Sequence, residues 1–224
     1  MPELEVDHEA SFKLKEEFKR LTVSQFKQEK DIHVTNLLWC LEKAARRIDN
    51  PQEEKPNRYM VEGTLAHLDL EPIIGALFGE GKVVTREKKI RWRGIVGTID
   101  LMIDGIPYEI KTNATGRVND TYLEQLSSYL IFTQAPYGKL VVRWLPRDFN
   151  TTDTEYHIDV YTYRPLREHL DEWVNTLTFR RDTVKASIRT GEHVPLEDIN
   201  RKFFECGSCI YAKLGCPYAI KGRY

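Results

Sequence analysis

The sequence of 224 residues predicts an α/β protein with a mixed central β-sheet flanked by helices. The first observation is a pair of β-rich runs around Asp104-Gly105, because Asp-Gly is the strongest local signal of a two-residue hairpin turn. The second is a helical segment, 122–130, which connects the hairpin to another β-rich run, 139–145, as a crossover does. The third is a long amphipathic helix over 166–188 that ends near a glycine.

Composition and charge narrow the class of protein. Apolar residues make up 41% and charged residues 30% of the chain, an ordinary mix for a globular protein with one sizeable core. The net charge of -1 excludes bulk electrostatic attraction to nucleic acid, so a DNA ligand would need a local basic groove. The N-terminus is acidic and no apolar run approaches the ~20 residues that span a bilayer. These features predict a cytoplasmic protein without a membrane partner.

The chain is predicted to form one integrated domain with three parts. An N-terminal helical segment occupies 1–57, a core occupies 58–190, and a cysteine-rich segment occupies 191–224. Within the first part, a loose apolar stripe over 11–30 predicts a surface helix.

Two helices and one basic strand are expected before the hairpin. A helix through 37–47 is predicted to begin at a capping side chain, either Thr35 or Asn36. A longer helix is predicted over 58–77. The strand expected over 82–93 is rich in Lys and Arg, which favours equally a groove that follows a phosphate backbone and an exposed edge strand protected by charge.

The two-residue turn fixes the register of the hairpin. Asp100 then faces Glu109, and Lys111 lies on the same side of the sheet. The opposite side is apolar and carries Ile99, Leu101, Ile103, Ile106, Tyr108 and Ile110. The Cβ atoms of facing residues are about 5 Å apart, so two facing carboxylates repel unless a cation lies between them. This predicts a Mg²⁺ or Mn²⁺ site with Lys111 beside it. The alternative is a solvated charged surface, which the apolar reverse side disfavours.

Two further groups of polar residues have helical spacing. Gln125 and Tyr129 are one turn apart, so both are expected on the side of their helix that faces the site. His67 lies in the helix expected over 58–77. A lone helical histidine is more often structural than a ligand or a base, so spacing alone leaves its role open.

Four cysteines in a reducing compartment indicate free thiols or metal ligands before disulfides. Cys206, Cys209 and Cys216 cluster near the C-terminus, and Cys40 is the remaining cysteine. The number of thiolates is compatible with zinc as well as with an iron-sulfur cluster.

The order of these motifs resembles the CRISPR-associated, RecB-like Fe-S exonuclease family of the D…E-x-K nuclease superfamily. The resemblance spans 40–216 and rests on Cys40, Glu62-Gly63-x₃-His67, Gly97-x₂-Asp100, Glu109-Ile110-Lys111, Gln125-x₃-Tyr129 and Cys206-x₂-Cys209-x₆-Cys216. It implies a restriction-endonuclease-like nuclease core and an Fe-S lobe built from the N- and C-terminal segments.

The resemblance also implies a role for each residue. The carboxylates of Asp100 and Glu109, the carbonyl of Ile110 and the His67 ring would bind Mn²⁺ or Mg²⁺, and Lys111 would position the attacking water. Gln125 and Tyr129 would contact DNA as further members of the catalytic group. A 4Fe-4S cluster would be held by Cys40, Cys206, Cys209 and Cys216.

The function implied by the resemblance is a metal-dependent DNA exonuclease that prefers single-stranded ends. It would act with CRISPR integrase proteins in spacer acquisition and antiviral defence. One alternative is a repair, recombination or phage-encoded nuclease of the same superfamily, and another is a non-catalytic Fe-S-stapled DNA-binding subunit. A homo-oligomer is compatible with the sequence.

Overall fold

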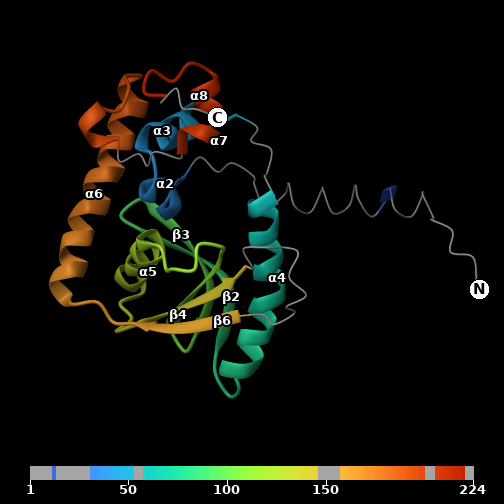
Figure 1. Ribbon diagram of the computed structural model, residues 1–224. Helices are drawn as coiled ribbons and strands as arrows, with labels where there is room; N and C mark the ends of the chain where they lie inside the picture. Colours follow the sequence, from blue (N-terminus) through green and yellow to red (C-terminus); the bar gives the residue numbers. More distant parts are fainter. Residues whose placement is uncertain (1–11, 14–30, 53–57, 146–156, 200–204, 220–224) are drawn as a thin grey trace, which may run out of the picture.

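The computed structural model describes residues 12–13, 31–52, 58–145, 157–199 and 205–219 (Figure 1). The surface helix expected over 11–30 lies almost entirely outside the described residues. None of the described helices is long and apolar enough to cross a membrane.

The centre of the fold is a six-stranded mixed sheet. Its strands are β1 (Ile32–His33), β2 (Val84–Trp92), β3 (Ile95–Ile103), β4 (Ile106–Asn113), β5 (Gly138–Trp144) and β6 (His157–Tyr163). β3 pairs with β2 along one side and with β1 and β4 on the other, and β5 and β6 follow β4. The β4–β5 and β1–β3 pairs are parallel and the others are antiparallel. The predicted mixed sheet is confirmed, and among the described strands β1, β2 and β6 each pair with one neighbour.

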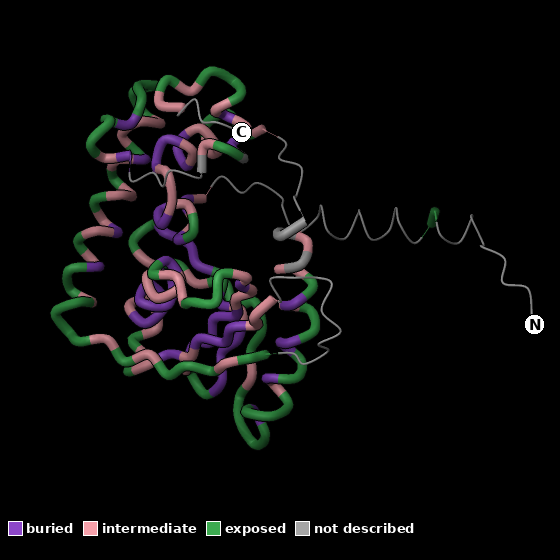
Figure 2. Tube along the Cα trace, viewed as in Figure 1, coloured by how far each residue is buried: buried purple, intermediate pink, exposed green. Residues whose placement is uncertain are grey.

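Helices cover both faces of this sheet. α4 (Arg58–Phe78) lies on one side, and α5 (Asp120–Thr133) and α6 (Arg167–Thr190) lie on the other (Figure 1). α5 connects the parallel strands β4 and β5, so the predicted crossover is confirmed. Figure 2 shows the buried residues concentrated in the central strands and in the helices near the N-terminus, with exposed residues along the outer helices.

The helix expected through 37–47 is two helices, α2 (Val34–Leu38) and α3 (Leu41–Asp49). The cap of α2 is His33, whose backbone N–H donates to Asn36 Oδ1 at 2.9 Å, so the predicted capping residues were wrong. The break has a long-range cause. The backbone N–H of Leu41 donates to the carbonyl of Ile199 at 2.9 Å instead of continuing the first helix, and Cys40 becomes the N-cap residue of α3.

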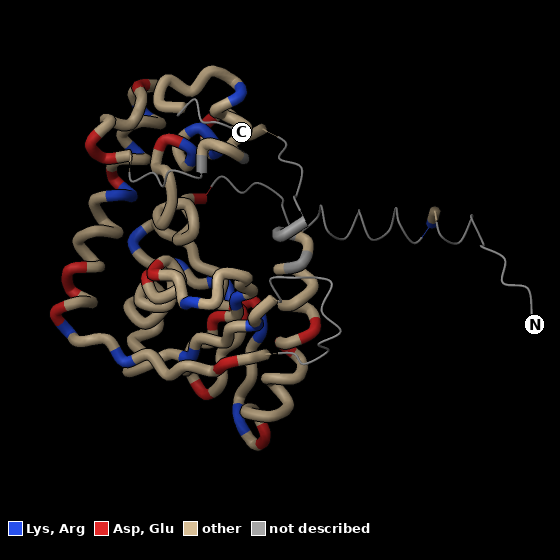
Figure 3. Tube along the Cα trace, in the orientation of Figure 1, with Lys and Arg blue, Asp and Glu red and all other residues tan. Residues whose placement is uncertain are grey.

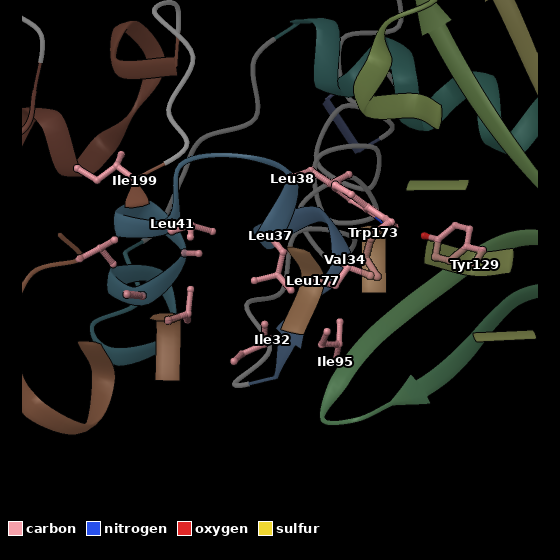
Figure 4. Close-up of a cluster of buried hydrophobic side chains, with 14 of the residues drawn as sticks. Ile32, Val34, Leu37, Leu38, Leu41, Ile95, Tyr129, Trp173, Leu177 and Ile199 are labelled. Atoms are coloured by element: carbon pink, nitrogen blue, oxygen red, sulfur yellow. The ribbon is translucent and has the colours of Figure 1, made fainter. Parts of the chain in front are cut away.

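One hydrophobic cluster joins these N-terminal helices to α6 and to the start of β3. Figure 4 shows Val34 and Leu37 from α2, Ile95 from β3 and Trp173 and Leu177 from α6 as members of this cluster. Each of these five side chains is at most 7% exposed. The N-terminal segment therefore shares its core with the sheet and α6.

The hairpin between β3 and β4 has the predicted turn and register. Asp104 and Gly105 have φ values of 49° and 79°, the positive pair that a type I′ turn requires. The paired residues are Leu101–Tyr108, Met102–Pro107 and Ile103–Ile106, as expected. The predicted ladder would continue to Asp100–Glu109, but the observed pairs end at Leu101–Tyr108.

The apolar side of the hairpin is mostly as predicted. Leu101, Ile103, Tyr108 and Ile110 pack in one buried cluster, and Leu70 and Ile74 of α4 complete it. Ile99 belongs instead to the cluster on the α5 and α6 side. Between Ile99 and Leu101 the β2–β3 ladder lacks one pair, opposite Glu87, whose φ is 46°. At this distortion Ile99 and Leu101, which were expected to face the same side, pack in different clusters.

Candidate functional site

The predicted acidic site forms where β3 and β4 stop pairing. Asp100 Oδ2 accepts a hydrogen bond of 2.7 Å from the backbone N–H of Ile110, which holds the carboxylate between the two strands. Burial raises the pKa of Asp100, and the charges of His67 and Lys111 act in the opposite direction. Local separation of the two strands thus makes room for an ionisable side chain inside the sheet.

Glu109 and Lys111 lie on β4, two residues apart, and form an ion pair in the same site. Glu109 is fully buried, and its Oε2 atom has no hydrogen-bond partner among the described residues. Burial and the neighbouring Asp100 charge raise the pKa of Glu109 to about 7. Burial disfavours the charged form of Lys111, yet its two carboxylate neighbours outweigh this and raise the pKa of Lys111 above its ordinary value.

α4 adds two side chains to this acidic site. His67 Nδ1 lies 3.5 Å from Asp100 Oδ1 and 3.6 Å from Glu71 Oε1. The Glu71 carboxylate and the Asp100 charge raise the pKa of His67 despite its burial. Glu71 was missed by the sequence reasoning, although it lies one helical turn after His67 and the i, i+4 spacing is a signal that identifies such neighbours.

α5 supplies the predicted pair Gln125 and Tyr129. Gln125 Nε2 donates to the Tyr129 hydroxyl at 2.8 Å, and this hydroxyl donates to the carbonyl of Thr98 at 2.7 Å. Both side chains are buried. Burial, together with the Glu109 and Asp100 charges, raises the pKa of Tyr129 well above 10, so the hydroxyl stays protonated. The pair therefore ties α5 to β3 beside the acidic residues.

The structure thus brings His67, Asp100, Glu109, Lys111 and Tyr129 into one electrostatic group. Carboxylate and carbonyl oxygens suit Mg²⁺ and Mn²⁺, and the unpartnered Oε2 of Glu109 is a buried oxygen with capacity for such an ion. In the described part of the chain, no three His, Cys, Asp or Glu side chains are already arranged around a common metal position. The donor types fit the predicted ion, and binding it would require side-chain movement.

All four cysteines line a second site, a small cavity that they share with Lys43 and three residues of the C-terminal segment. Cys40 comes from the break between α2 and α3, and Cys206 lies in α7 (Glu205–Ser208). Cys209 is the N-cap residue of α8 (Ile210–Lys213), and Cys216 follows it. No disulfide joins any of these four described residues. The cavity lies where the C-terminal helices pack near α3, away from the acidic site (Figure 1).

The two signs of charge are interspersed over the described chain (Figure 3). This distribution agrees with the net charge of -1, while exposed basic side chains gather along β2 at Arg86, Lys88, Lys89 and Arg91. Attraction of a nucleic acid would therefore depend on local groups.

Comparisons with known proteins inform the fold. No protein-family model matches the chain, and no curated protein matches it. The structure of SSO0001 is similar with a TM-score of 0.59 and 23% sequence identity, over 93% of this chain and 98% of that one. An alkaline exonuclease, LHK-Exo from Laribacter hongkongensis, is similar with a TM-score of 0.53 and 17% identity, over 76% of this chain and 95% of that one. Its complex with dAMP gives a TM-score of 0.50 and 16% identity, over 78% of this chain and 95% of that one. The chain therefore has the mixed α/β fold found in this exonuclease.

Proposed function

We propose that the protein is a metal-dependent DNA exonuclease. The observation that carries the proposal is the buried Glu109 carboxylate, which has one oxygen without a partner and lies beside Asp100 and Lys111. A protein that only bound DNA would have no need to place a fully buried carboxylate beside two partly buried charged groups at the cost of their hydration. The fold shared with an alkaline exonuclease, which also binds dAMP, supports the same activity.

The residues have distinct parts in this proposal. Asp100, Glu109 and the Ile110 carbonyl would hold Mn²⁺ or Mg²⁺, with His67 completing the site. The bound ion would lower the pKa of a water molecule and neutralise phosphate charge. The Lys111 ammonium, held by its ion pair with Glu109, would orient the attacking water and stabilise the charge that develops as the phosphorus–oxygen bond to the leaving group breaks.

Gln125 and Tyr129 would act indirectly, without contacting the phosphate. Their hydrogen bonds fix the Thr98 carbonyl, and Thr98 lies two residues before Asp100 on β3. The same pair was expected to contact DNA directly, which remains a prediction.

The test is a cleavage assay on end-labelled single-stranded, duplex and circular DNA with Mn²⁺ or Mg²⁺. We expect linear DNA to be shortened from an end, single strands faster than duplex, and circles to be resistant. Asp100→Asn and Lys111→Ala should each lose at least about a hundredfold in rate, because they remove a metal ligand and a charge that acts in the transition state. Asp171→Asn is the matched control, since this carboxylate is 60% exposed on α6.

Cleavage by Asp100→Asn at the wild-type rate with the same metal would reject the proposal. Cleavage of circular DNA would be consistent with a nuclease but would reject the proposal that it acts only from DNA ends.

We further propose that this activity takes part in CRISPR spacer acquisition, together with CRISPR integrase proteins. The support is the sequence resemblance over 40–216. A repair, recombination or phage nuclease with the same site is the alternative. The CRISPR role predicts integrase genes beside the gene for this chain and co-purification of the integrase proteins with it. Recombination genes in the same position would favour the repair, recombination or phage role.

For the four cysteines we propose a 4Fe-4S cluster with a structural role. The support is that four thiol side chains from two distant parts of the sequence line one cavity. Zinc is the competing ligand, because it accepts four thiolates as well. Metal analysis of anaerobically purified protein separates the two.

A further inference from the structure

Three ring side chains converge on one carboxylate at the β6 edge of the sheet. Trp144 Nε1 donates to Asp159 Oδ2 at 2.7 Å, and the Tyr161 hydroxyl donates to the same oxygen at 3.0 Å. His157 Nε2 lies 3.3 Å from Asp159 Oδ1. Each hydrogen bond uses an atom on the edge of a ring. We name Trp144, His157 and Tyr161, with Asp159, the β6 platform.

The platform is exposed although its rings are held in place. The His157 side chain is 71% exposed and Tyr161 is 39% exposed, while Trp144 is half-buried. Within the described residues, none of the three rings stacks on another aromatic ring or receives a cation on its face. The His157 and Tyr161 rings are thus fixed at their edges and exposed, which is the arrangement that a flat ligand needs.

Strand register places the platform on the same side of the sheet as the proposed hydrolytic residues. Lys111 pairs with Val142, and Val142 pairs with Asp159. Paired residues point to the same side of a sheet, so the Lys111 and Asp159 side chains share one side, about 10 Å apart across two strand spacings. The neighbouring row on that side, beginning at Asn113, ends at Trp144 and His157.

Tyr122 of α5 packs near both groups. The Lys111 ammonium lies 5.8 Å from the centre of the Tyr122 ring. Tyr122 and Trp144 both pack against the cluster formed by Leu126, Leu140 and Val142. The aromatic side chain next to Lys111 therefore shares its packing partners with Trp144 of the β6 platform.

We propose that the β6 platform binds single-stranded DNA by stacking bases on its rings, next to the site where the strand is cut. The proposal rests on the nuclease function above and deepens it by naming a binding surface for the strand. Every base has a flat face, so this binding tolerates any sequence, as an exonuclease requires. Stacked bases direct the sugar-phosphate backbone outward, away from the Asp159 carboxylate, whose role is to orient the rings.

Binding is measured on the full chain in EDTA, where no DNA is cut, by fluorescence anisotropy of a labelled oligothymidylate and of a labelled blunt hairpin duplex. We expect Tyr161→Ala and His157→Ala each to weaken oligothymidylate binding by about tenfold, because each removes a stacking ring. Tyr161→Phe keeps the ring and should stay within about threefold of wild type, whereas Tyr161→Leu keeps apolar volume and should lose as much as Ala. Phe179→Ala is the matched control, since Phe179 is 53% exposed on α6.

Wild-type binding by the Tyr161→Ala, His157→Ala double variant, with an unchanged circular dichroism melt, would overturn the proposal. Equal losses on oligothymidylate and duplex would overturn it too, because the faces of bases within a duplex are already stacked on the neighbouring base pairs. The cleavage assay tests the nuclease function separately. If the protein shows no metal-dependent cleavage but the platform variants still bind oligothymidylate more weakly, the nuclease function is rejected and the binding surface is supported.

Discussion

At the scale of single residues, the acidic site depends on side chains that hold other side chains in place. His67 is the clearest case, because its Nδ1 atom lies between the Asp100 and Glu71 carboxylates. A carboxylate on one ring nitrogen fixes the orientation of a histidine and leaves the other nitrogen for a metal ion. Glu71 is therefore expected to act as a positioning residue.

The Glu71→Gln variant tests this role. We expect Mn²⁺ affinity to fall by about 10–100-fold, because the amide orients His67 less strongly than the carboxylate does. Cleavage at saturating Mn²⁺ should stay close to wild type, since Asp100, Glu109 and Lys111 are intact. The measurement is cleavage rate against Mn²⁺ concentration, with Glu172→Gln on the exposed side of α6 as control. An unchanged Mn²⁺ dependence would show that Glu71 does not position the histidine.

At the scale of elements, a buried carboxylate joins α3 to the segment after α6. Glu42 is 2% exposed, and its Oε1 atom accepts from Arg46 Nε at 2.5 Å and lies 2.8 Å from His193 Nδ1. Its Oε2 atom accepts from the backbone N–H of Val194 at 2.9 Å. Burial acts to raise the pKa of Glu42, but these three partners outweigh it and hold the pKa below its ordinary value.

The Glu42→Gln variant should lose about 2 kcal/mol of unfolding free energy near neutral pH, because hydrogen bonds to a charged group are the stronger ones. A lowered pKa in the folded protein stabilises it above the pKa of the unfolded chain, and this stabilisation disappears as pH falls through the folded pKa. Urea unfolding should therefore show the gap between wild type and variant closing below about pH 4. Glu192→Gln, an exposed neighbour, should show no gap. A gap independent of pH would attribute the effect to packing.

Elements set by nearby residues were predictable from the sequence, and those set by distant contacts were not. The turn at Asp104-Gly105 and the end of α6 at Gly191 depend on local backbone conformation, and both were predicted. The break before α3 follows from a hydrogen bond between Leu41 and Ile199, which no local pattern contains. Ile99 was misplaced for a related reason, since the β2–β3 ladder is interrupted next to it, where Glu87 of β2 lies opposite Asp100.

The candidate site divides in the same way. Asp100, Glu109 and Lys111 were predicted together because one short hairpin carries all three. The β6 platform was not predicted, because Trp144 and Asp159 meet through the register of β5 and β6. A tight turn between two strands fixes their register, but a longer connection such as the one between β5 and β6 does not.

At the scale of the whole molecule, the cysteine cavity connects the beginning of the described core to the end of the chain. Cys40 lies between α2 and α3, whose apolar residues pack with α6 in one cluster, and Tyr218 of the C-terminal segment packs against the same cluster. A cluster ligated by all four cysteines would close a loop that contains five of the six strands, β2 to β6. Closing so long a loop restrains the unfolded chain, so its principal effect is on stability.

The Cys209→Ala variant tests this consequence. Wild-type protein purified anaerobically should be brown and contain about four irons per chain. The variant should be colourless, with a lower Tm, because three thiolates hold the cluster less well and the loop is no longer closed. Its cleavage rate well below Tm should remain near wild type, since Asp100 and Glu109 lie outside the cavity.

Ala212→Ser is the matched control, because this residue lines the same cavity without a thiol, so the variant should keep its iron and its Tm. Colourless wild-type protein with one zinc per chain would show that the four cysteines bind zinc and not an iron-sulfur cluster. Loss of cleavage in a Cys209→Ala protein that is still folded would contradict a purely structural role.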